Sequence, residues 1–149
     1  MIDFSFSQEQ ELIRDTARKF AQKELLPKYS FWDKHPEFPL HLVRKMADLG
    51  FMGMTIPKKY GGQELDRVSN GIVVEELAKG DFNLSILTFG LMGDVLTQHG
   101  TDDQKNYWLP ALAQGKRIIG ISLTESESGS DAGSIKTTAV RDGDEWIIN

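Results

Sequence analysis

The stretch Leu123–Gly133 gathers hydroxyl groups, glycines and carboxylates and has almost no apolar side chain. Glycine lets a ligand approach the backbone closely, and backbone N–H groups and hydroxyls can donate to a phosphate or to the edge of a ring. Carboxylates repel an anion, so they must point away from it or be neutralised by basic groups. Three carboxylates lie here, on Glu125, Glu127 and Asp131. From spacing alone the stretch is either an anion-binding loop or a solvated turn.

Other residue types that often carry chemistry indicate no site. The chain has no cysteine, which excludes thiolate zinc sites, disulfides and a cysteine nucleophile. His35, His41 and His99 lie far apart, without the spacing of metal ligands. Glu75 and Glu76 are adjacent, but adjacent helix positions point about 100° apart, so we interpret them as a solvated helix face. The sequence assigns no catalytic residue and no metal site.

Composition narrows the class of protein. A chain of 149 residues with 40% hydrophobic residues can bury a core without a disulfide or metal. The net charge of −5 comes from 17 basic and 22 acidic residues of mixed order, which predicts no nucleic-acid partner. No signal-peptide core follows Met1, and no apolar run could cross a bilayer. We expect a cytoplasmic protein, or an organelle-matrix protein if this is a mature chain.

The N-terminal part shows the pattern of helices. A Ser-x-x-Gln capping box at residues 7–10 begins a first helix, and its apolar residues recur at helical spacing up to Pro27. A second helix is predicted over residues 39–50, with a proline in its first turn and a glycine at its end. A third is predicted over residues 66–80, with an aspartate as its N-cap.

Two more helices are expected after the third. Asp81 can cap a fourth helix ending at Gly100, and apolar residues surround it on nearly every side, so it should lie in the middle of a bundle. A second capping box at residues 101–104 begins a fifth helix, which Pro110 interrupts and Gly115 ends.

The C-terminal part changes to the two-residue repeat of strands. Apolar residues alternate over 119–123, and residues 137–140 and 145–149 form two more predicted strands joined by a turn. About three short strands cannot bury their faces or satisfy their edges without more sheet. The predicted class is α+β: a helical domain of about five helices over 1–115, and the truncated beginning of a β-barrel-like domain over 116–149.

Several segments together resemble the acyl-CoA dehydrogenase family. Its flavin-binding signature reads apolar-Thr-Glu-Pro, two small residues and Gly-Ser-Asp, and residues 121–131 are similar to it. Four further segments agree with the family in order and spacing: Ile56-Pro-x-x-Tyr-Gly-Gly62, Glu75-Glu-Leu-Ala78, Gly100-Thr-x-x-Gln-Lys105 followed by Leu109-Pro110, and Gly143-Asp-Glu-x-x-Ile-Asn149. The resemblance covers the whole chain. Two residues depart from it, because Ser126 replaces the proline and Glu127 replaces a small residue.

The resemblance implies a fold, a cofactor and site residues. The family has an N-terminal helical domain, a central β-domain and a C-terminal four-helix bundle, with FAD between the last two. Ile121, Leu123 and Thr124 would contact FAD, the last two at the pyrimidine edge of its isoalloxazine. Gly129 and Ser130 would approach the pyrophosphate, and Ser130 would also touch the acyl-CoA.

Phe89 and Leu91 are weaker candidates for substrate contact. In the family the wall of the corresponding helix lines the acyl pocket, so the resemblance implies that these two side chains touch the acyl chain. Packing in the helical core is the alternative for both.

The resemblance also implies the reaction, which converts an acyl-CoA thioester to a trans-2-enoyl-CoA. The carboxylate that takes the α-proton lies in the family's C-terminal domain and has no counterpart here, so the chain is predicted to be inactive by itself. An electron-transfer flavoprotein or a similar acceptor, and a homotetramer of the full-length protein, are the implied partners. The alternatives are a non-catalytic helical interaction module, an acyl-CoA oxidase and an enoyl-CoA reductase.

Overall fold

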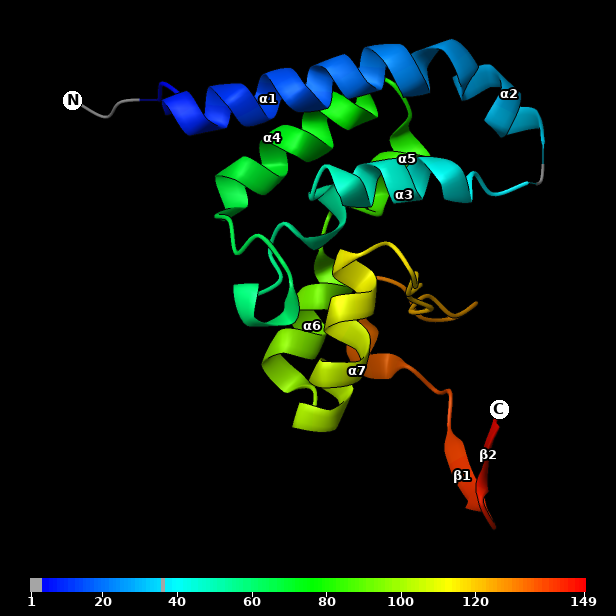
Figure 1. Ribbon diagram of the computed structural model, residues 1–149. Helices are drawn as coiled ribbons and strands as arrows, with labels where there is room; N and C mark the ends of the chain where they lie inside the picture. Colours follow the sequence, from blue (N-terminus) through cyan, green and yellow to red (C-terminus); the bar gives the residue numbers. More distant parts are fainter. Residues whose placement is uncertain (1–3, 36) are drawn as a thin grey trace. The chain divides into compact units, whose positions relative to one another are not determined.

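The computed structural model describes residues 4–35 and 37–149. Met1, after which the sequence predicts no signal-peptide core, lies outside the described residues. The chain forms two compact units, one extending to Ile119 and the other from Gly120 to Asn149 (Figure 1). The domain boundary expected after Gly115 stays a prediction. No helix of the described residues is long and apolar enough to cross a membrane.

Helix α1 (Gln8–Phe20) begins at the predicted capping box. The Ser7 hydroxyl accepts a hydrogen bond from the Gln10 backbone at 3.1 Å, and the Gln10 side chain accepts one from the Ser7 backbone at 3.0 Å. The helix continues through a π-helical turn, η1 (Ala21–Leu25), into a 3₁₀ turn, η2 (Leu26–Lys28). A short helix that the sequence did not predict, α2 (Tyr29–Lys34), follows the proline in this turn.

The predicted second helix is α3 (Leu40–Asp48), and a tightly folded loop follows it. Two 3₁₀ turns, η3 (Phe51–Gly53) and η4 (Lys58–Tyr60), lie in this loop. Gly62 is packed so closely that a Cβ atom there would lie 2.0 Å from the Ile56 carbonyl oxygen. Only glycine therefore fits at this position.

The predicted third helix is α4 (Arg67–Ala78), and Figure 1 shows it running alongside α1. Asp66 caps it as expected, because its Oδ1 accepts a hydrogen bond from the Ser69 backbone at 2.8 Å.

The prediction of one long fourth helix is wrong. The chain forms α5 (Phe82–Ile86) and a separate α6 (Leu91–His99), with Gly90 between them in the left-handed region at φ +80°. These helices do not lie in the middle of a bundle, because large apolar side chains of the two helices and of the segment that connects them are exposed. These side chains are Phe82, Ile86, Phe89, Leu91 and Val95. The apolar residues occupy several faces, and only some of those faces meet the core.

Helix α7 (Asp102–Ala113) begins at the second predicted capping box, in which Thr101 and Gln104 bond reciprocally. The prediction that Pro110 interrupts the helix is wrong, since α7 runs through it without a break. Figure 1 shows α6 and α7 side by side in the first unit.

Two clusters of buried side chains form the core of the first unit. The larger joins α1, η1, α3, α4 and α5, and the smaller joins α7 to the loop around η4. The buried members of the larger cluster are Ala17, Phe20, Ala21, Leu25, Leu42, Val43, Met46, Phe51, Met54, Val73, Leu77 and Leu84. Those of the smaller are Ile56, Tyr60, Leu109, Leu112 and Ala113.

The second unit contains a 3₁₀ turn, η5 (Ala132–Ser134), and one antiparallel hairpin of β1 (Ala139–Asp142) and β2 (Glu145–Ile148). The register pairs Ala139 with Ile148 and Asp142 with Glu145. The strand predicted over 119–123 is wrong, because this segment has no regular structure and no ladder partner among the described residues. A helix-rich unit followed by the beginning of a sheet confirms the predicted α+β class.

Candidate functional site

The segment 121–134 folds back on itself as a tight loop within the second unit. The backbone N–H of Glu125 donates to the Ser128 carbonyl at 2.8 Å, and the N–H of Ser128 donates back to the Glu125 carbonyl at 3.4 Å. The buried Ser128 hydroxyl donates to the Asp131 carbonyl at 2.7 Å. Ser134 Oγ lies 2.9 Å from the same carbonyl and 3.1 Å from Ser128 Oγ. The small hydroxyl residues therefore hold the loop in one conformation.

Glu125 turns its carboxylate into its own segment. Its Oε2 accepts the Lys136 backbone N–H at 2.9 Å, and its Oε1 accepts the Thr137 backbone N–H at 2.8 Å and the Thr137 hydroxyl. These donors, the Lys136 N–H first among them, lower the pKa of Glu125 below its ordinary value of 4.5. The charge of Glu125 is thus satisfied locally and is not directed at a ligand.

Glu127, which departs from the family pattern, is paired as well. Its Oε2 forms an ion pair with the ammonium group of Lys136. Two of the three carboxylates of the stretch, Glu125 and Glu127, therefore meet the condition set by the sequence, that carboxylates beside an anion must turn away or be neutralised. The sequence could have suggested this partner, because a lysine at position 136 is a cation in an otherwise acidic and uncharged stretch.

The five residues predicted to contact FAD, namely Ile121, Leu123, Thr124, Gly129 and Ser130, are all exposed. Thr124 and Gly129 lie next to each other, because a Cβ atom at Gly129 would be 3.9 Å from Thr124 Cγ2. Within residues 4–35 and 37–149, the N–H groups of Leu123 and Thr124 have no hydrogen-bond acceptor. The loop thus presents the free N–H groups of Leu123 and Thr124, while the Glu125 carboxylate is bonded within its own segment and the exposed Glu127 carboxylate is paired with Lys136. This donor set fits the electronegative edge of a flavin and a pyrophosphate.

The two predicted acyl-contact residues lie in the first unit, on either side of Gly90. Phe89 is 56% exposed and Leu91 is 44% exposed, so the core-packing alternative is wrong for both. The break between α5 and α6 presents these apolar side chains at the surface.

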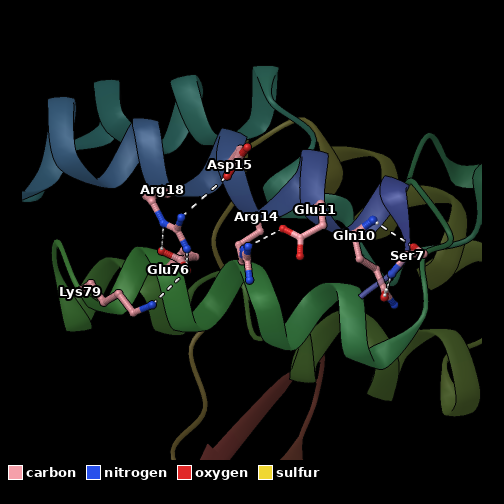
Figure 2. A network of polar contacts seen from close by, with 8 residues as sticks. All are labelled: Ser7, Gln10, Glu11, Arg14, Asp15, Arg18, Glu76 and Lys79. Atoms are coloured by element: carbon pink, nitrogen blue, oxygen red, sulfur yellow. Dashed lines mark hydrogen bonds and ion pairs between the residues drawn. The ribbon is translucent and has the colours of Figure 1, made fainter. Parts of the chain in front are cut away.

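The interpretation of Glu76 as a solvated residue is wrong, although Glu75 is exposed. Glu76 is buried, and it accepts from Arg18 Nη2 at 2.8 Å, Arg18 Nε at 3.1 Å and Lys79 Nζ at 2.9 Å (Figure 2). The hydrogen bond from Arg18 is the main cause that lowers the pKa of Glu76 to about 2, against the opposing effect of burial. A carboxylate that is ionised at neutral pH and bonded to two cations stabilises the α1–α4 contact and is a weak proton acceptor.

No group of three or more histidine, aspartate or glutamate side chains in the described part of the chain has the geometry of a metal site.

Comparison with known proteins identifies the family. The family model described as "Acyl-CoA dehydrogenase, N-terminal domain" matches residues 7–116. This chain belongs to the acyl-CoA dehydrogenase family. The sequence resemblance, which depended on short motifs, is thereby confirmed.

Individual relatives show what share of their length this chain covers. It is 38% identical over 151 residues to the short-chain specific acyl-CoA dehydrogenase of Clostridium acetobutylicum, covering 99% of this chain and 40% of that protein. It is also 38% identical to the NADH-dependent acryloyl-CoA reductase of Anaerotignum propionicum, covering 99% of this chain and 39% of that protein. The chain therefore spans about 40% of the length of these relatives.

A solved structure gives the same result. The chain superposes on a glutaryl-CoA dehydrogenase of Mycobacterium smegmatis, determined in complex with FADH2, with a TM-score of 0.86 and 33% identity. The match covers 97% of this chain and 38% of that chain.

Proposed function

We propose that this chain is the N-terminal part of an FAD-dependent flavoprotein that oxidises an acyl-CoA thioester to a trans-2-enoyl-CoA. The observation that carries the proposal is the loop 121–134, in which the N–H groups of Leu123 and Thr124 are free while Glu125 is bonded within its own segment and Glu127 is paired with Lys136. Membership of the acyl-CoA dehydrogenase family and the likeness to a structure holding FADH2 support FAD as the cofactor.

The residues of the loop have distinct proposed roles. The free N–H groups of Leu123 and Thr124 and the Thr124 hydroxyl would donate to the pyrimidine edge of the isoalloxazine, where negative charge builds up on reduction. Ile121 would contact FAD, and Gly129 and Ser130 would approach its pyrophosphate, where the absence of a side chain at residue 129 would allow close contact. Bound FAD supplies the acceptor for the hydride that leaves the β-carbon.

Substrate binding is proposed for Ser130, Phe89 and Leu91. Ser130 donates to the acyl-CoA, and the exposed Phe89 and Leu91 provide apolar surface for the acyl chain. The carboxylate that takes the α-proton is proposed to lie in the C-terminal domain that the family resemblance implies, outside this chain. An electron-transfer flavoprotein or a similar acceptor, and assembly as a homotetramer, belong to the same proposal for the full-length protein.

A second candidate is the reverse reaction, reduction of an enoyl-CoA. The observation that favours it is the acryloyl-CoA reductase relative, which is as similar to this chain, at 38% identity, as the short-chain dehydrogenase. The residues described here serve both directions equally, since binding and orientation of flavin and thioester are common to both.

Turnover assays test the proposal. A full-length protein containing this chain, supplied with FAD, is assayed on a panel of acyl-CoA thioesters with an artificial electron acceptor, and on enoyl-CoA thioesters with NADH. Peroxide formation in air, without the artificial acceptor, reports an oxidase. We expect turnover of acyl-CoA by the full-length protein and none by the 149-residue chain alone. Turnover by the chain alone refutes the assignment of the base, and no turnover of any thioester by the full-length protein refutes the proposed function.

A further inference from the structure

Asn70 is a buried polar residue on the side of α4 that faces the core. Its side-chain Nδ2 donates a hydrogen bond to the backbone carbonyl oxygen of Thr88 at 2.7 Å and lies 3.9 Å from Met54 Sδ. Thr88 is buried as well, at the end of the α5 segment. One side chain thus connects the middle of α4 to the connection between α5 and α6.

The break in the helix explains why the Thr88 carbonyl needs a donor from outside. In a continuous helix this carbonyl would accept the N–H four residues later. The left-handed Gly90 interrupts that pattern, since the N–H of Phe89 bonds back to Ile86 at 3.1 Å and α6 begins only at Leu91. A buried carbonyl without a partner is costly, and the Asn70 amide supplies the missing donor.

The other side of the break is fixed by close packing. A Cβ atom at Gly90 would lie 2.8 Å from Thr55 Oγ1, in the loop that follows η3. Glycine at position 90 therefore meets two requirements, the positive φ and the space. Asn70 and Thr55 therefore both constrain residues 88–90, and the side chains on either side of Gly90 are Phe89 and Leu91.

We propose that Asn70 is a positioning residue that determines acyl-chain specificity. Its hydrogen bond fixes the backbone at Thr88, and the fixed backbone orients the Phe89 and Leu91 side chains toward the acyl chain. The inference rests on the proposed function, because it concerns the surface offered to the acyl group. It adds a determinant that touches neither substrate nor cofactor.

The first arm of the test examines the 149-residue chain and needs no flavin. Asn70→Leu keeps the approximate size of the side chain and removes the donor. Asn70→Ser, whose shorter side chain cannot reach the Thr88 carbonyl, is the milder variant to use if Asn70→Leu does not fold. We expect amide hydrogen exchange at Thr88 and Phe89 to become about 5- to 150-fold faster in either variant, the range for an unsatisfied buried acceptor. Asn83→Leu, at an exposed asparagine of α5, is the control and should leave both amides unchanged. Equal exchange in the Asn70 variants and the control overturns the proposal.

The second arm examines the full-length protein. The ratio of kcat/KM between a short straight-chain and a long straight-chain acyl-CoA should shift at least about 3-fold in Asn70→Leu or Asn70→Ser. Thr101→Ala, which destabilises α7 through the loss of its cap, should leave the ratio unchanged. Loss of stability without a shift in the ratio shows a structural role only and overturns the proposal. A full-length protein that turns over no thioester refutes the proposed function instead, while the exchange arm still decides whether Asn70 holds the break.

Discussion

Replacement of Glu76 by glutamine tests the ion-pair network between α1 and α4 (Figure 2). A pKa lowered from 4.5 to about 2 corresponds to about 3 kcal/mol of stabilisation at neutral pH. Arg18 is 40% exposed and Lys79 is 55% exposed, so solvent screening reduces this value. We expect Glu76→Gln to lower the free energy of unfolding by about 2 kcal/mol at pH 7.

The pH dependence gives the sign of the effect. Because the folded state lowers the pKa of Glu76, its contribution is fully present above pH 4.5 and is lost as the pH falls towards 2. The difference in stability between the wild type and Glu76→Gln should therefore shrink over that interval. Urea unfolding followed by far-ultraviolet circular dichroism at a series of pH values measures it.

Glu75→Gln is the matched control on the same helix. Glu75 is 70% exposed and, among residues 4–35 and 37–149, its carboxylate forms an ion pair with Lys79 Nζ alone, at 3.0 Å, so its replacement should change stability by less than about 0.5 kcal/mol. Equal losses in the two variants at pH 7, or a difference for Glu76→Gln that stays constant down to pH 2, would refute the reasoning.

Two further predictions concern the loops. Gly62→Ala should destabilise the chain by at least about 3 kcal/mol in urea unfolding, since its Cβ would collide with the Ile56 carbonyl. Gly71→Ala is the control, because a Cβ atom at this position of α4 would meet open space, and it should stabilise the chain by about 0.5–1 kcal/mol. Similar changes in the free energy of unfolding for the two variants would contradict this account. The Glu125 carboxylate accepts hydrogen bonds from the backbone amides of Lys136 and Thr137, so Glu125→Gln should make hydrogen exchange at these two amides about 5-fold faster. Glu127→Gln should leave exchange at both amides nearly unchanged, because the ion pair of Glu127 is exposed. Exchange that is equal in these two variants would show that the Glu125 carboxylate does not hold the loop.

Local signals predicted the helix starts correctly. The capping boxes at Ser7 and Thr101 and the cap at Asp66 involve residues three positions apart, so the sequence contains both partners of each bond. The fold class and the family were also accessible, because they depend on patterns repeated along the chain.

One physical cause of the errors is contact between distant segments. Glu76 is buried because Arg18, 58 residues earlier, approaches it, and no local pattern shows this. The break at Gly90 was hidden because apolar periodicity continues across it and a glycine is tolerated within a helix. The alternation over 119–123 predicted a strand, but a strand also needs a ladder partner, which the described chain does not provide.

The candidate site, too, could be predicted only in part from the sequence. The sequence indicated the segment with free donors, since Thr124, Gly129 and Ser130 lie in a recognisable motif. It did not show how Glu125 and Glu127 are neutralised, because their partners at residues 136 and 137 lie about ten residues further along. Asn70 was missed although a polar residue at helical spacing from the buried Val73 is a usable signal.

The central claim is that the loop 121–134 holds part of a flavin, and an equilibrium FAD titration of the full-length protein tests it most directly. The account predicts saturable FAD binding, with a Kd about 10-fold higher in Thr124→Val because one hydrogen bond to a developing charge is lost. Thr138→Val, at an exposed threonine of the same unit, should bind FAD as the wild type does. An identical Kd in all three proteins, or no FAD binding by the wild type, would contradict the account.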